Sequence, residues 1–230
     1  MNRIKSINFH EPTPDIGTWR LIYLNFLNQM KISSICEVGS GHPRFLEIIR
    51  ANKKLAIDFG DDFERDFLKS NINFLNLDLD NDSLEKVTDK FDAVVCSDVF
   101  EHLLNPERTL KFCKNILNQE GIFFSHVPNE FNFIRAIRVM FLNRESVSFH
   151  SADEQNNPHL RRFTNTGYLS FLKKEFEFNL YISDLNYIGI KKFLNKIKFP
   201  IPYGFQFGPT YISTNDPNKY KEIKKIKSSL

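Results

Sequence analysis

Short continuous apolar runs alternate along the chain with apolar stripes at helical spacing. The runs predict strands buried on both faces, because a parallel strand covered on both sides is apolar throughout. The stripes predict amphipathic helices that cover a sheet. We expect strands over 34–38, 54–57, 73–77, 93–96, 122–127, 178–188 and 207–214. We expect helices over 16–30, 43–49, 61–70, 82–89, 105–117 and 164–174, with Gly121 ending the helix before the fifth strand. Alternating strands and helices predict an α/β fold.

A glycine turn follows the first strand. Gly39, Ser40 and Gly41 come directly after it, where glycines allow positive φ and let a ligand lie against the main chain. Pro43 then opens the helix and has no N–H, so the turn lacks a donor that a pyrophosphate would need. The pattern therefore favours a cofactor with ribose and adenine but no phosphate, such as S-adenosylmethionine (SAM).

Two carboxylates flank this turn. Glu37 stands at the end of the first strand, where it can hold the amino end of a methionine moiety. Asp58 ends the second strand, 17 residues beyond Gly41, close to where a nucleotide-binding βαβ unit carries the acid for both ribose hydroxyls. We expect both acids to contact the cofactor.

Several motifs resemble those of one enzyme family. Residues 37–41, Glu-Val-Gly-Ser-Gly, look like the first motif of the class I SAM-dependent methyltransferases. Residues 91–103, Phe-Asp-Ala-Val-Val-Cys-Ser-Asp-Val-Phe-Glu-His-Leu, are similar to the fourth-strand motif of the small-molecule branch, and residues 159–164 continue the likeness. The resemblance covers about residues 16 to 185 and departs at Pro43, where the family has a third glycine.

This resemblance implies a fold, a cofactor and a reaction. The fold is a doubly wound, mostly parallel seven-stranded sheet with helices on both faces, Rossmann-like, whose last strands form a hairpin-like pair. The reaction is methyl transfer from SAM to a small-molecule acceptor, which we expect to be O-methylation of a hydroxyl on a sugar or on a phosphorylated or nucleotide-linked metabolite. The residues expected to bind SAM are Glu37, Gly39, Ser40, Gly41, Asp58, Asp78, Leu79 and Ser97.

A hydroxyl acceptor needs a base, because its proton must leave as the new bond forms. The catalytic candidates are His159, His150 and Asp98. His159 lies in the stretch that the resemblance places on the acceptor side, and an imidazole has a suitable pKa; tying a lid to the sheet is the alternative role. His102 is expected to be structural.

Residues 128–162 are longer than an ordinary connection, which predicts an acceptor-side insertion. Arginines cluster in or beside it, and their planar guanidinium groups suit phosphate or carboxylate, so the acceptor is expected to be anionic. The alternative is that they pair with surface acids. These arginines are Arg135, Arg138, Arg144, Arg161 and Arg162.

Composition limits the remaining possibilities. With 230 residues we expect a single domain over 1–230, with residues 1–15 as an N-terminal arm. A net charge of +3 is too small to indicate a nucleic-acid partner, and no apolar run reaches membrane-spanning length. Three cysteines lack metal-binding spacing, so no metal is expected, and they read as reduced thiols of a cytoplasmic protein. The 24 phenylalanines are expected in the core, and the basic stretches 191–198 and 219–227 on the solvated surface.

Two other functions remain open from the residues alone. A nicotinamide-dependent oxidoreductase would use the same βαβ unit, although Pro43 argues against it. A non-catalytic SAM-binding partner protein would keep the cofactor residues without the chemistry. Retention on SAM against NAD separates the first alternative, and turnover separates the second.

Overall fold

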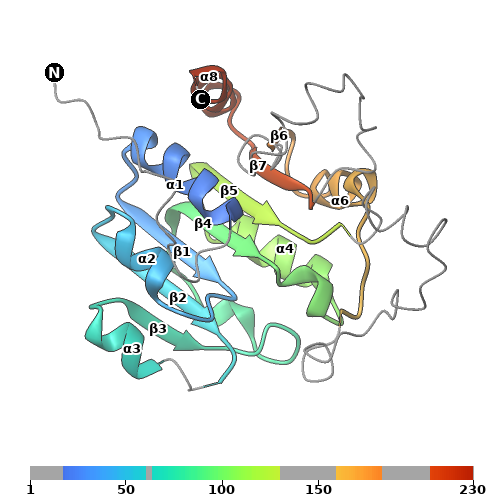
Figure 1. Cartoon of the computed structure of the whole chain (residues 1–230). Helices are drawn as coiled ribbons and strands as arrows, with labels where there is room; N and C mark the ends of the chain where they lie inside the picture. The colour runs from blue at the N-terminus through green and yellow to red at the C-terminus, as the bar shows by residue number, and fades with distance from the viewer. Residues whose placement is uncertain (1–17, 61–63, 130–158, 183–207, 230) are drawn as a thin grey trace, which may run out of the picture.

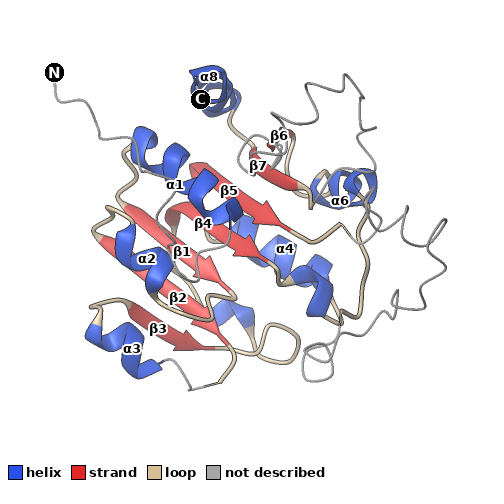
Figure 2. Cartoon of the chain, in the orientation of Figure 1, coloured by secondary structure: helices blue, strands red, loops and turns tan. Residues whose placement is uncertain are grey.

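The computed structural model describes residues 18–60, 64–129, 159–182 and 208–229, which form a seven-stranded sheet with helices on both faces (Figures 1 and 2). The strand order is β3-β2-β1-β4-β5-β7-β6. Neighbouring strands run parallel except β7, which is antiparallel to both β5 and β6. The predicted fold class is confirmed. The strands are β1 (Ser34–Val38), β2 (Lys53–Asp58), β3 (Asn73–Asn76), β4 (Phe91–Ser97), β5 (Leu117–His126), β6 (Phe178–Ile182) and β7 (Thr210–Thr214).

The helices divide between two hydrophobic cores, one on each face of the sheet. The first core contains buried residues of α1, α2, α3 and α8, and the second contains those of α4 and α6. Phenylalanine dominates the largest fully buried side chains in both, as expected from composition. The helices are α1 (Thr18–Met30), α2 (Arg44–Ile48), α3 (Glu64–Lys69), α4 (Pro106–Asn115), α6 (Asn165–Leu172) and α8 (Pro217–Ser229), with 3₁₀ turns η1 (Leu84–Lys86) and η2 (Phe100–His102).

Strand alternation decides which polar side chains face α1. Ile35 and Val95 lie in the core beneath α1, while Cys36 and Val94 lie in the opposite core. Because side chains alternate along a strand, Glu37 and Ser97, each two residues further along, also face α1. Both stand at the carboxyl ends of their strands, the edge where open parallel sheets bind ligands.

Two expectations about elements were wrong, and one helix was not expected. The basic stretch 219–227 lies within α8, where Lys221, Lys224, Lys225 and Lys227 are exposed, as expected, while Ile223 and Ile226 are buried against the sheet. Gly121 lies inside β5 and ends no helix; a Cβ there would lie 2.8 Å from the Leu117 side chain, so the strand accepts only glycine without adjustment. Residues 82–89 form only the turn η1; the Asp82 carboxylate accepts from the upstream Asp78 N–H, so it does not cap a helix that follows.

A second group of expectations lies outside the described residues: the arm 1–15, most of the insertion 128–162 with His150, and residues 183–188 and 207 of the expected strands. The described ends of the insertion meet, because Asn129 forms a parallel bridge with Phe163. These two described ends therefore lie side by side.

Asp92 fastens the amino-terminal edge of the sheet, opposite the edge that carries Glu37 and Ser97. Its carboxylate accepts from the N–H groups of Ser33 and Ser34 at 2.9 Å, from the Ser33 hydroxyl at 2.6 Å and from the Asn118 amide at 2.7 Å. Burial alone would raise the pKa of Asp92, but these donors outweigh it and lower the pKa to about 2. One side chain thus joins the starts of β1, β4 and β5.

Candidate active site

The glycine turn lies at the carboxyl ends of β1 and β2. Gly39 and Gly41 have φ values of 70° and 59°, and the N–H of Gly39 donates to Ile57 O at 2.8 Å. The two glycines serve different needs. A Cβ on Gly39 would lie 2.2 Å from Val99 Cγ2, whereas one on Gly41 would enter open space with nothing within 4 Å. Gly39 permits close packing, and Gly41 borders room for a ligand.

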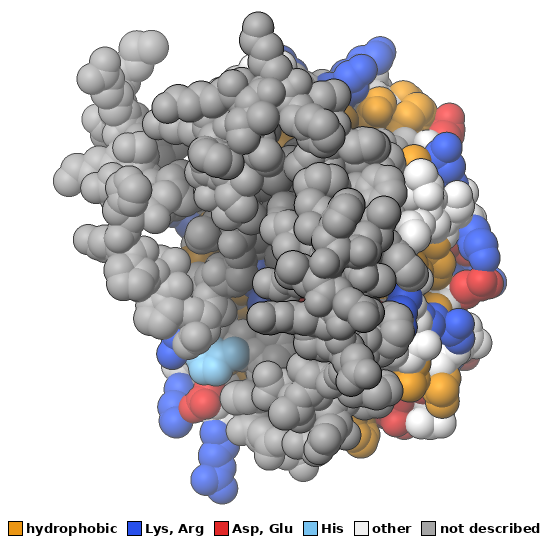
Figure 3. Space-filling model, turned by 45° about the vertical axis from the view of Figure 1, so that its right-hand side comes forward, with side chains coloured by type: hydrophobic (Ala, Val, Ile, Leu, Met, Phe, Trp, Pro, Cys, Tyr) orange, Lys and Arg blue, Asp and Glu red, His pale blue; other side chains and the backbone are white. Residues whose placement is uncertain are grey.

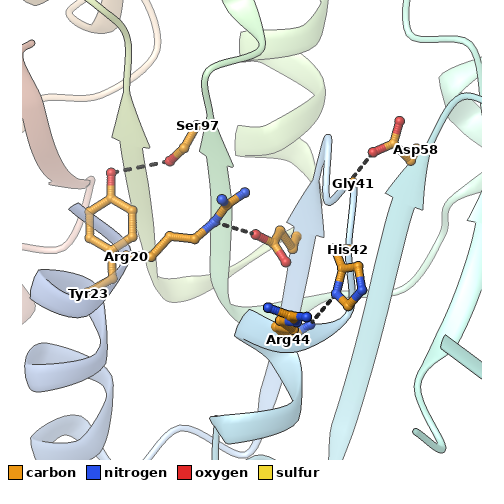
Figure 4. Close-up of polar contacts among 8 residues, drawn as sticks. Arg20, Tyr23, Gly41, His42, Arg44, Asp58 and Ser97 are labelled. Carbon is orange, nitrogen blue, oxygen red and sulfur yellow. Dashed lines mark hydrogen bonds and ion pairs between the residues drawn. The ribbon is translucent and has the colours of Figure 1, made fainter. Parts of the chain in front are cut away.

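Asp58 lies beside that open space. Its Oδ2 accepts from the N–H of Gly41 at 2.5 Å (Figure 4). Its Oδ1 accepts from the N–H of Phe59 at 2.7 Å. The carboxylate is partly exposed, so lone pairs remain for another donor. The structure thus brings together the acid and the turn that the sequence predicted to act together.

Glu37 is a buried carboxylate with only part of its hydrogen-bonding capacity used. Nε of Arg20, on α1, lies 3.3 Å from Glu37 Oε1. Its Oε2 is buried and has no hydrogen-bond partner among the described residues. Burial raises the pKa of Glu37 to about 8, while the Arg20 guanidinium acts in the opposite direction. A cationic or N–H donor from a ligand would satisfy Oε2.

Two serines complete this side of the site. The Ser40 hydroxyl is buried in the turn without a hydrogen-bond partner among the residues described. The Ser97 hydroxyl lies 3.3 Å from the Tyr23 hydroxyl of α1 (Figure 4). Both stand on the edge of the sheet that carries Glu37, so α1 closes the site above the ends of β1 and β4.

Asp78 and Leu79 follow β3. The Asp78 carboxylate accepts from the Asn81 side-chain amide at 2.9 Å and from the N–H groups of Asp80 at 2.9 Å and Asn81 at 3.1 Å, which folds the loop into a tight turn. These donors, the Asn81 side chain foremost, lower the pKa of Asp78. Leu79 is buried in the core. The structure gives both residues a role in shaping this loop, and their contact with the cofactor stays a prediction.

Asp98 begins the segment after β4 in an unusual backbone conformation, with φ of 55°. Its Oδ1 lies 3.6 Å from Nε2 of His126, too far for a hydrogen bond. Burial lowers the pKa of His126 to about 3, and its Nδ1 lies 2.9 Å from the Thr210 hydroxyl. His126 is therefore a neutral support for the sheet end, and Asp98, 41% exposed, is the group at this point that can face a substrate.

His159 lies against η2. Its ring contacts that of His102, with centroids 4.8 Å apart. Arg161, expected to bind an anionic acceptor, donates instead to the carbonyls of Leu103 (3.1 Å) and Leu104, and its N–H donates to Glu101 O at 3.0 Å. That expectation for Arg161 is corrected: the residue fastens the segment that carries His159 onto η2.

The family model described as "Methyltransferase domain" matches residues 18–181, a span that contains every site residue described above. The chain belongs to this family. The predicted enzyme class and the cofactor SAM are confirmed with it: the protein is a SAM-dependent methyltransferase.

Solved methyltransferases share this fold. A SAM-dependent methyltransferase from Thermotoga maritima, described as a possible histamine N-methyltransferase, has a TM-score of 0.52 and 18% identity over 86% of this chain and 91% of its own. The plantazolicin methyltransferase BpumL, solved with a monoazolic desmethylPZN analog and SAH, has a TM-score of 0.56 and 17% identity over 86% and 83%. The N-terminal domain of EvdMO1, solved in the presence of SAH and D-fucose, has a TM-score of 0.55 and 12% identity over 87% and 84%.

One curated relative matches a short stretch of the methyltransferase. The Ubiquinone biosynthesis O-methyltransferase of Glaesserella parasuis serovar 5 (strain SH0165) is 43% identical over 42 residues. The match spans 18% of this chain and 18% of that protein.

The charge of the methyltransferase surface and the composition of its helices are relevant to a nucleic-acid or membrane partner. On the face drawn in Figure 3, lysine and arginine side chains are interspersed with acidic and uncharged ones. No described helix combines the length and apolar composition needed to cross a bilayer. The expected cytoplasmic location and the absence of a nucleic-acid partner stay predictions.

Arg20 is the site residue that sequence reasoning missed in this methyltransferase. It lies on α1, 17 residues before Glu37, and no motif marks it. The sequence carries one signal: Arg20 is a polar residue near the start of an amphipathic helix, directly after Trp19. This end of the helix is the one nearest the carboxyl ends of the strands. Only the packing of α1 over β1 turns that position into a contact with Glu37.

Proposed function

We propose that SAM binds across the carboxyl ends of β1, β2 and β4, with its ribose at Asp58 and its amino-acid end at Glu37. The observation that carries the proposal is the pair of buried oxygens, Glu37 Oε2 and Ser40 Oγ, that have no hydrogen-bond partner among the described residues. Buried polar groups are nearly always satisfied, so these two favour a polar ligand.

The residues present fit such a cofactor. The amino-acid end of SAM carries an ammonium and a carboxylate, which match the Glu37 carboxylate and the Arg20 guanidinium. Gly41 borders open space and Asp58 lies next to it, which suits a ribose edge lying against the main chain. When bound, SAM supplies an electrophilic methyl group, and the chain's own residues hold and orient it.

Replacing Asp58 tests this placement. Asp58→Ala is expected to weaken SAM binding by about 1.5 to 3 kcal/mol, the range for losing hydrogen bonds to a charged group. Calorimetric titration with SAM measures the change. The matched control is Asp66→Ala, an exposed acid that pairs with Lys69 within α3 and should leave affinity unchanged. Equal SAM affinity in wild type and Asp58→Ala would refute the ribose assignment.

We further propose that the acceptor is a small molecule methylated on oxygen, a sugar or a phosphorylated or nucleotide-linked metabolite. Asp98, which follows β4, and His159, which lies against η2, are the polar groups that we assign to the acceptor. The short match to an O-methyltransferase and the fold likeness to a domain solved with D-fucose support this choice. Because carbonyls engage Arg161, an anionic acceptor would be bound by the other arginines of the cluster, of which Arg135, Arg138 and Arg144 lie outside the described residues.

The acceptor can be found directly. Incubating the protein with methyl-labelled SAM and a fractionated small-molecule extract should give one labelled product. Mass spectrometry of that product identifies the acceptor atom, and a methyl on nitrogen or carbon would contradict O-methylation.

A further inference from the structure

Three metal-ligating side chains meet beside η2. Glu101 and His102 belong to η2, and His159 comes from a segment more than fifty residues later. One donor atom from each, a carboxylate oxygen and two imidazole nitrogens, lies within 4.8 Å of the other two. Glu101 is only 1% exposed, while the two histidines are partly exposed, so the group opens toward solvent from a buried acid.

The surrounding contacts hold this group in place. The N–H of Arg161 donates to Glu101 O, and its side chain donates to the carbonyls of Leu103 and Leu104. These contacts of Arg161, two residues after His159, join the segment that carries His159 to η2, which carries Glu101 and His102. Rigid placement of ligands by such neighbouring hydrogen bonds is characteristic of functional metal sites.

We propose that Glu101, His102 and His159 bind a divalent transition metal ion. Two imidazoles and one carboxylate form a donor set that suits Zn²⁺ and similar ions better than Mg²⁺, which prefers oxygen. Ligand bonds of about 2.1 Å place tetrahedral ligand atoms roughly 3.4 Å apart, so side-chain rotations that bring the donor atoms closer by up to about 1.4 Å are sufficient. Burying the Glu101 carboxylate beside a cation also offsets the cost of removing its charge from water.

No metal was expected from the sequence, because the three cysteines lack metal-binding spacing. The ligands here are adjacent in η2 and distant at His159, so spacing along the chain does not reveal the third member. The site also gives His159 a role other than that of a free base, since a metal-bound imidazole nitrogen cannot take a proton.

The role of the ion rests on the proposed function, although its binding does not. Three protein ligands leave positions open for an acceptor hydroxyl, whose pKa a bound cation lowers. The hydroxyl proton passes to solvent, and an oxygen lone pair forms the new bond to the methyl carbon. The bond between that carbon and sulfur breaks, and its electron pair stays on sulfur.

The test is calorimetric titration of the chelator-treated full-length protein with Zn²⁺ alone. We expect one Zn²⁺ per chain, with affinity at least tenfold weaker in His102→Gln, in His159→Gln and in Glu101→Gln. His42→Gln is the matched control, because it removes an exposed histidine from the glycine turn and should bind Zn²⁺ like wild type. No stoichiometric Zn²⁺ binding by wild type, or wild-type binding by both His102→Gln and His159→Gln, would overturn the site.

Two further measurements keep the result decisive. The unfolding midpoint and SAM affinity of each variant report whether it is folded, and a variant that loses Zn²⁺ while keeping both supports the site. Because Glu101 is buried, the two histidine variants decide the outcome if Glu101→Gln fails to fold. If wild type binds SAM but not Zn²⁺, the metal site is refuted and the proposed methyl transfer is unaffected. If wild type binds Zn²⁺ but transfers no methyl group, the metal site stands and the proposed methyl transfer is refuted.

Discussion

Glu37 shows how one buried carboxylate couples proton binding to folding. Burial raises its pKa to about 8 in the folded protein, whereas an unfolded glutamate titrates near 4.5. Between these values the folded state holds a proton that the unfolded state has lost. The contribution of Glu37 to stability is therefore fully present below about pH 4.5 and is lost as pH rises through 8.

The same coupling predicts a proton released on cofactor binding. If the ammonium of SAM lies next to Glu37, as proposed, it favours the ionised carboxylate, so the pKa of Glu37 falls and a proton leaves at pH 7. Calorimetric titration with SAM in two buffers of different ionisation enthalpy measures this release. Glu37→Gln should bind SAM more weakly and give the same heat in both buffers. A wild-type heat independent of the buffer would place the ammonium away from Glu37.

At the scale of elements, the sheet is fastened at the edge opposite the site. Asp92 joins the starts of three strands through hydrogen bonds from Ser33, Ser34 and Asn118. Burial raises the pKa of Asp92, but these donors outweigh it and lower the pKa to about 2. The stabilisation from Asp92 is therefore present above the ordinary aspartate pKa near 3.8 and is lost as pH falls through 2.

Asp92→Asn is expected to destabilise the fold at pH 7 by about 1 kcal/mol, at the low end for charged hydrogen bonds because solvent reaches the group. Urea unfolding at several pH values measures it. The deficit should shrink as pH falls toward 2. Asp66→Asn, which breaks an exposed pair in α3, should change stability by less than about 0.5 kcal/mol and serves as the control. A pH-independent deficit would mean that the carboxylate charge is irrelevant.

For the whole molecule, α8 completes the hydrophobic core on the α1 face. Ile223 is fully buried there with residues of α1 and β5. Ile223→Ala is expected to cost about 2 to 4 kcal/mol in free energy of unfolding, through lost burial and the cavity left behind. Denaturant titration measures it. Ile48→Ala in α2, where the side chain is 44% exposed, should cost much less; similar losses would show that α8 contributes little to the core.

Sequence patterns predicted much of this molecule, and particular residues show where they stop. The apolar runs predicted the strands, because a strand buried on both faces is apolar at every position. Gly39, Gly41 and Asp58 were predicted because each stands at or just after the end of such a strand. Helix α8 was missed because lysines surround its two buried isoleucines, which suffice for the last helix on a sheet. Arg20 and the grouping of His159 with Glu101 and His102 were missed because they depend on how distant elements pack.

The position of β7 has a consequence for how this chain is made. β7 lies between β5 and β6 in the sheet. Its partners in β5 are far away in sequence: Thr210 pairs with His126, 84 residues earlier. During synthesis β5 therefore keeps an open hydrogen-bonding edge until residues 210–214 leave the ribosome. An open edge invites pairing with other chains, and such distant contacts form slowly. We infer that ribosomes stalled before residue 210 hold an aggregation-prone sheet, which the final strand protects by insertion.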